Sequence, residues 1–139
     1  MRRITVDDLV GTIAREAEVS EDLARAGTLC IGVSVDHALS KLAKEGVSGE
    51  DTIKTSGAFL LPNLTIEKLI TMVMGGGPFT RPQAERIVQA AQQHLVKTIK
   101  EGQVVEVENL GSFQVSPGTR DIGPESTLLF KPSGPQPIP

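Results

Sequence analysis

Two amphipathic stretches with the same hydrophobic spacing divide the chain. Residues 5–17 carry apolar side chains at the i, i+3, i+4 spacing of one helix face, and residues 65–77 repeat that spacing 60 positions later. The repeated positions are Val6, Leu9, Val10, Ile13 and Ala14 in the first stretch and Ile66, Leu69, Ile70, Val73 and Met74 in the second. Thr5 and Thr65 precede the stretches as N-cap residues, so we predict two equivalent short helices.

A longer helix is predicted after each short one. Ser20 and Thr80 are N-cap residues that start these helices, and both helices end at Lys-Glu-Gly, at 44–46 and 100–102. The first long helix is about one turn longer, because its stop comes four positions late relative to the repeat. Gly27 and Gly32 lie inside it, where each costs about 1 kcal/mol relative to Ala. We therefore expect close packing against another backbone, or a local irregularity, at these glycines.

A strand, a glycine turn and a second strand follow each long helix in the sequence pattern. The second half alternates Val105 and Val107 with glutamates before 110–115, and the first half offers 52–55 before 56–61. The triplets 57–59 and 111–113 both read Gly-small-Phe, and only the second half continues into a further strand at 127–132. We predict a unit at 1–64, a second unit at 65–132 and a disordered tail at 133–139.

Composition argues against a generic binder of polyanions. The 139 residues include 14 Lys plus Arg against 17 Asp plus Glu, a net charge of -3, and the pI is about 5.4. Proteins that hold DNA by displacing counterions need clustered cations, so a DNA-binding function requires a local basic patch here. The aromatic residues are all Phe and make up 3% of the chain, which argues against binding single strands by base stacking.

Motifs for catalysis, cofactors or membranes are lacking. The lone Cys30 can form neither an internal disulfide nor a thiolate metal cluster, and we expect it to be a small buried hydrophobe. His37 and His94 lie in the long helices away from any carboxylate cluster, and the run 75–78 lacks the Gly-Lys-Ser/Thr of a phosphate loop. We predict no enzyme activity, no cofactor, no metal, no small-molecule substrate and no membrane segment, and a cytoplasmic location.

The ordered set of elements resembles the HU/IHF family of bacterial histone-like DNA-binding proteins. The resemblance rests on the two helices, the Gly stop, Leu110-Gly111-Ser112-Phe113-Gln114-Val115 and the final Phe130-Lys131-Pro132. It covers residues 65–132 well and residues 5–61 more weakly. It implies an α+β fold in which a helical-hairpin base carries small antiparallel β-sheets. Members are intertwined dimers, so two units in tandem imply a single-chain pseudo-dimer with 61–64 as the crossover.

The resemblance also implies partners and site residues. Double-stranded DNA is the implied partner and the nucleoid the implied location, with a second copy or another HU-like chain as a further partner. Lys131 matches a family position close to phosphates, and Gly111 and Ser112 match a turn whose backbone N–H groups can face phosphate. Proximity to the implied DNA-binding saddle adds these cations as candidates: Arg2, Arg3, Lys54 and Arg120.

The β-arms of the family are where this sequence departs most. Family arms are long and basic and carry a Pro that wedges between base pairs. The corresponding link at 116–126 holds Arg120 alone among cations, balanced by Asp121 and Glu125, and the first unit has no arm. Two hypotheses stay open at this point. One is an HU-like protein that binds DNA weakly and without sequence specificity; the other is an interaction or assembly module that kept the fold and lost DNA binding.

Overall fold

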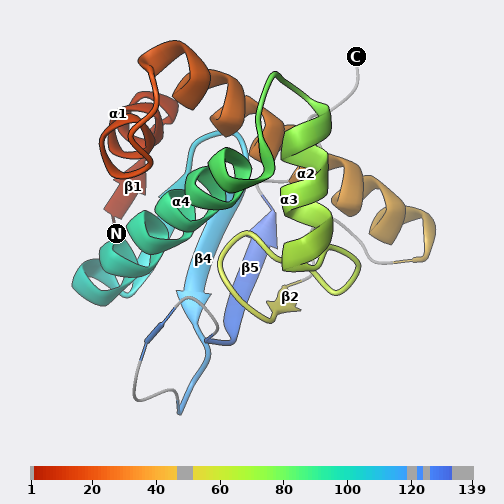
Figure 1. Ribbon diagram of the computed structural model, residues 1–139. Helices are drawn as coiled ribbons and strands as arrows, with labels where there is room; N and C mark the ends of the chain where they lie inside the picture. The colour runs from red at the N-terminus through yellow and green to blue at the C-terminus, as the bar shows by residue number, and fades with distance from the viewer. Residues whose placement is uncertain (1, 47–51, 119–121, 124–125, 133–139) are drawn as a thin grey trace, which may run out of the picture.

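The structure is a computed structural model that describes residues 2–46, 52–118, 122–123 and 126–132 (Figure 1). Within these residues the elements, in chain order, are β1 (Arg2–Ile4), α1 (Val6–Glu16), α2 (Glu21–Lys44), β2 (Ile53–Thr55), α3 (Ile66–Gly75), α4 (Arg81–Gly102), β3 (Val104–Val107), β4 (Gly111–Val115) and β5 (Leu128–Pro132). The tail at 133–139, predicted to be disordered, lies outside the described residues.

All four helices begin at the caps that the sequence predicts. The Thr5 hydroxyl accepts the Asp8 amide at 3.1 Å, and Ser20 and Thr65 cap their helices in the same way. Thr80 forms a full capping box with Gln83. The apolar stripes face inward, with Val10 and Ile13 of α1 and Leu69 and Val73 of α3 among the buried side chains. The predicted pairs of short and long helices are therefore confirmed.

The four helices contact one another reciprocally. Each short helix packs on the long helix that follows it, α1 on α2 and α3 on α4, and also on the other long helix, α1 on α4 and α3 on α2. The two long helices meet at Gly27 and Ile87, where a Cβ added to Gly27 would lie 2.7 Å from Ile87 Cγ2. Gly27 is thus needed for close packing, as predicted, although the neighbour is a side chain rather than a backbone.

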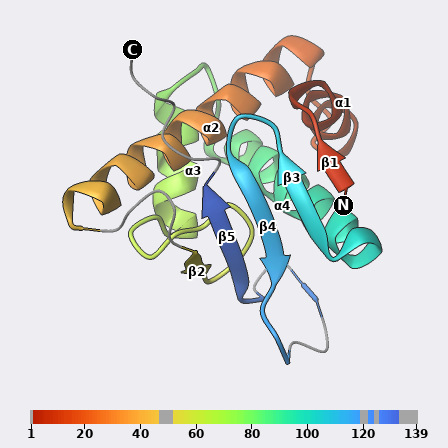
Figure 2. The same cartoon turned by 180° about the vertical axis from the view of Figure 1, so that it is seen from behind.

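One mixed sheet joins the two halves of the chain. Its strand order is β1-β3-β4-β5-β2; β1 runs parallel to β3 and the other neighbours are antiparallel (Figure 2). The expectation of separate small antiparallel sheets is therefore wrong in detail. The second strand predicted for the first unit does not form, because residues 56–61 make a buried turn in which Phe59 has a φ of 63°. The remaining strand, β2, pairs with β5 of the second unit instead.

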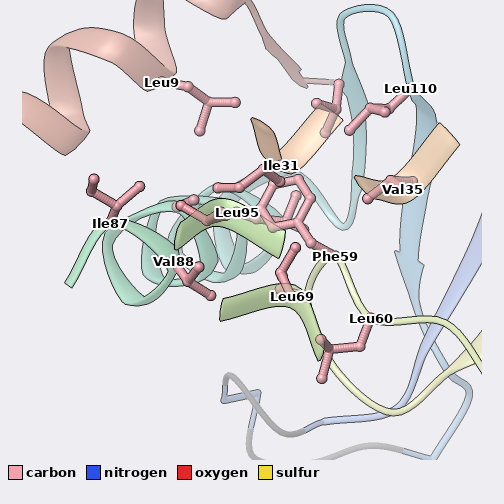
Figure 3. Close-up of a cluster of buried hydrophobic side chains, with 14 of the residues drawn as sticks. Leu9, Ile31, Val35, Phe59, Leu60, Leu69, Ile87, Val88, Leu95 and Leu110 are labelled. Carbon is pink, nitrogen blue, oxygen red and sulfur yellow. The ribbon is translucent and has the colours of Figure 1, made fainter. Parts of the chain in front are cut away.

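Three phenylalanines connect the helical layer to the sheet. Phe59 contacts Phe113 edge to face, with ring centroids 5.7 Å apart, and Phe113 stacks on Phe130 at 4.5 Å. All three are buried, as the sequence predicts, and Figure 3 shows Phe59 among the side chains of Ile31, Leu69 and Leu95. The core is therefore continuous across residue 64, the predicted boundary between units, and that division stays a prediction.

Replacing Gly27 tests the helix crossing. Gly27→Ala forces the new methyl group against Ile87 and should cost about 1–3 kcal/mol of unfolding free energy. Gly11→Ala is the matched control, because Gly11 also lies inside a helix but has open space where its Cβ would be; it should gain up to about 1 kcal/mol. Urea unfolding measures both. A Gly27→Ala variant as stable as the original protein would contradict the close crossing.

Candidate nucleic-acid interface

The sheet has one face covered by helices and one open face. Helix α4 contacts β1, β3 and β4 from one side, and Figure 2 shows the sheet lying in front of the helical layer. Successive side chains of a strand point to opposite faces. Val105, Phe113 and Phe130 are buried against the helices, so their sequence neighbours project from the other side, which we call the open face.

Strand register arranges the open face in two rows. Arg3 pairs with Glu106, Glu106 with Ser112, and Ser112 with Lys131, which gives a row across four strands. A second row runs through Val104, Gln114, Leu129 and Lys54. Among the described residues, these two rows carry three cations, Arg3, Lys54 and Lys131, and one carboxylate, Glu106, with Ser112, Gln114 and the apolar Val104 and Leu129 as their other members.

Lys54 and Lys131 form the most basic part of this face. Lys54 lies opposite Leu129, and Lys131 is two residues further along β5, so the two lysines are diagonal neighbours about 7–8 Å apart along the sheet. Both are exposed, and neither forms an ion pair with any residue that the structure describes. Two unpaired like charges at this spacing repel each other, and a shared anion such as a phosphate relieves that repulsion.

The two N-terminal arginines lie on opposite sides of β1. Arg3 is on the open face, 3.6 Å from a Glu108 oxygen and beside Glu106, so nearby carboxylates offset part of its charge. Arg2 is on the other side and packs against Gly102 at the end of α4. The sequence predicts that both arginines lie on the DNA-binding surface. Because side chains alternate along β1, Arg2 instead lies on the side that faces the helices.

Gly111 and Ser112 also differ in their placement. Gly111 is buried between Val107 and Pro132 and has a φ of 145°, a conformation that suits glycine. Ser112 is half-buried and lies on the open face beside Lys131. Arg120 lies outside the described residues. Of the seven candidate residues, the open face therefore brings together Lys131, Lys54, Arg3 and Ser112.

Gln114 is a member of this face that sequence reasoning missed. It is exposed, it lies two residues after Ser112 on β4, and its register partners are Val104 and Leu129. The alternation of Gly111–Val115 carried the signal, because a buried Phe113 sends both of its neighbours to the opposite side. An amide group there can donate a hydrogen bond to a phosphate oxygen.

Metal-ligating side chains do not gather in the part of the chain that the structure describes. The described residues contain no group of three or more His, Cys, Asp or Glu side chains able to hold a metal ion. Burial lowers the pKa of His94. Burial also raises the pKa of the Cys30 thiol, which is half-buried rather than buried as expected. No described helix is long and apolar enough to cross a membrane.

Comparison with known proteins identifies the second half of the chain. The family model described as bacterial DNA-binding protein matches residues 64–133, which is half of the sequence and contains β3, β4 and β5. No curated protein matches the chain. No solved structure matches it either. The matched family consists of DNA-binding structural proteins of the HU type and supports a nucleoid-associated role in general. The chain belongs to the family of bacterial DNA-binding proteins.

Proposed function

We propose that this protein binds double-stranded DNA through the open face of its sheet, as a single-chain pseudo-dimer. The observation that carries the proposal is the exposed, unpaired lysine pair, Lys54 and Lys131. One lysine comes from each half of the chain, so the basic patch exists only when both halves contribute strands to the sheet. Ser112 and Gln114 lie beside the pair and add hydrogen-bond donors for phosphate oxygens.

Equivalent residues of the repeat meet at the centre of the fold, and this supports the pseudo-dimer. Gly27 and Ile87 lie 60 positions apart, at matching places in the two long helices, and they contact each other. Phe59 and Phe113 end the two Gly-small-Phe triplets, and their rings are also in contact. In an assembly with two-fold symmetry, a residue on the axis touches its own equivalent. These two contacts therefore resemble those at the two-fold axis of a dimer interface, with both subunits in one chain.

The charge of the face indicates weak binding without sequence specificity. The open face has three cations, and carboxylates offset one of them, Arg3. Binding through so few phosphate contacts is weak and depends on salt. The described residues of the open face come from strands and offer lysine, serine and glutamine side chains, which suit contacts with phosphates. Residues 116–127, between β4 and β5, contain Arg120 with Asp121 and Glu125, and this composition does not supply the basic arm that the family resemblance implies.

Charge reversal on the open face tests the binding site. Lys54→Glu with Lys131→Glu should weaken binding to a nicked or kinked duplex by about 10–100-fold in about 50 mM salt, because two phosphate contacts become repulsions. Lys68→Glu with Lys97→Glu makes the same charge change on α3 and α4 and is the matched control. Gel-shift titration measures all three proteins. Equal loss in both double variants would show that net charge, and not the open face, governs binding.

Replacing Phe59 tests whether the two units share one core. Phe59→Leu removes the ring that contacts Phe113 and should cost about 1–3 kcal/mol. Because the core is continuous, amides of α4 and β4 in the second unit should lose hydrogen-exchange protection as much as those of α1 and α2. Protection lost in the first unit alone, with a separate unfolding transition for each unit, would contradict the pseudo-dimer.

A further inference from the structure

Helix α2 presents an apolar face that nothing in the described structure covers. Leu29 is 56% exposed and Val33 is 65% exposed, and they are the exposed large hydrophobic residues of the described chain. One helical turn separates them, so they lie side by side. They form one wall of a shallow groove of about 170 Å³, whose other walls include Leu9 of α1 and Leu110 at the start of β4.

The repeat provides an internal comparison for this face. Positions 60 residues later in α4 are occupied by Gln89 and Gln93, and both are exposed. The neighbouring buried positions match, with Ala24 and Ala84 both fully buried. The same location in the two units is therefore polar in one and apolar in the other. The fold does not require apolar residues there, since it accepts glutamine in the second unit.

Gly32 lies between Leu29 and Val33 and gives an independent observation. A Cβ added at Gly32 would have no atom within 4 Å, so packing inside the chain does not explain this glycine. Glycine inside a helix is less favourable than alanine, and of the two alternatives expected here, close packing against another backbone does not occur within the described residues. Glycine at this exposed position leaves a notch between Leu29 and Val33 that a protruding side chain of another molecule can fill.

The charges at the two ends of α2 favour a second copy of the same helix as the partner of this face. Its first turn is acidic, with Glu21 and Asp22, and its last turn is basic, with Lys41 and Lys44. Leu29 and Val33 lie near the middle of the helix. When two α2 helices cross antiparallel at that point, the acidic end of each meets the basic end of the other. A parallel pairing would instead place like charges together.

We propose that two copies of this protein associate through α2, antiparallel about a two-fold axis between Leu29 and Val33. Each Leu29 then packs toward the glycine notch of the second copy, and the helix ends form complementary charge pairs. Val33 is covered in the same step, which removes both exposed apolar side chains from water. Lys54 and Lys131 do not line the groove beside Leu29 and Val33, so the association can be tested separately from the proposed DNA binding.

Leu29→Gln with Val33→Gln is the decisive variant, because it installs the residues that α4 carries at the equivalent exposed positions. Sedimentation equilibrium over a concentration series should show the original protein passing from 14.8 kDa toward twice that mass, and the variant should associate at least about tenfold more weakly. Circular dichroism and the thermal midpoint verify that the variant folds. Gln89→Ala with Gln93→Ala is the matched control on α4 and should associate like the original protein.

A charge swap tests the antiparallel arrangement. Lys41→Glu with Lys44→Glu should weaken association, and Glu21→Lys with Asp22→Lys should do the same. Mixing these two variants pairs opposite charges at both ends and should restore it. The proposal is overturned if the original protein stays at 14.8 kDa at every concentration. It is also overturned if Leu29→Gln with Val33→Gln doubles in mass as readily, which would place the interface elsewhere.

Discussion

The contact between the rings of Phe59 and Phe113 is the interaction on which the arrangement of the molecule depends. It joins a buried turn of the first half to β4 of the second, and Phe113 passes the contact on to Phe130 in β5. Side chains alternate along a strand, so burial of the Phe113 and Phe130 rings turns the neighbouring Ser112 and Lys131 outward. A one-residue slip of either strand would exchange the two faces, so the aromatic core specifies the polar surface that lies behind it.

The net charge of -3 does not describe the surface that matters. Some of the acidic residues lie in the first turns of helices, where Asp7, Asp8, Glu21 and Asp22 interact favourably with the helix dipole. The open face collects cations from β1, β5 and β2, strands that are distant in sequence. Local basic charge and overall acidity are therefore compatible, and the acidity itself limits how tightly DNA can be held.

The helices could be predicted from the sequence because their caps and apolar periodicity are local signals, and Thr5, Ser20, Thr65 and Thr80 all act as expected. The joining of all five described strands into one sheet could not be predicted from the sequence. Strand β1 has three residues, too few for an alternating pattern, and its partner Val105 lies about a hundred positions away. For the same reason, the sequence did not reveal that Arg2 and Arg3 lie on opposite faces of the sheet. Alternation within β4 did hold enough information to place Gln114 on the open face, and it could have been used.

The two halves of the chain contribute different parts: the second half contains β3, β4 and β5, while the first half contains β1, β2 and the apolar face of α2. Binding of DNA by the open face is the central claim, and the salt dependence of duplex affinity tests it most directly. Three cations on this face predict a slope of log K against log salt of about −3. A slope of about −5 or steeper, as six phosphate contacts would give, or no binding in about 50 mM salt, would contradict it.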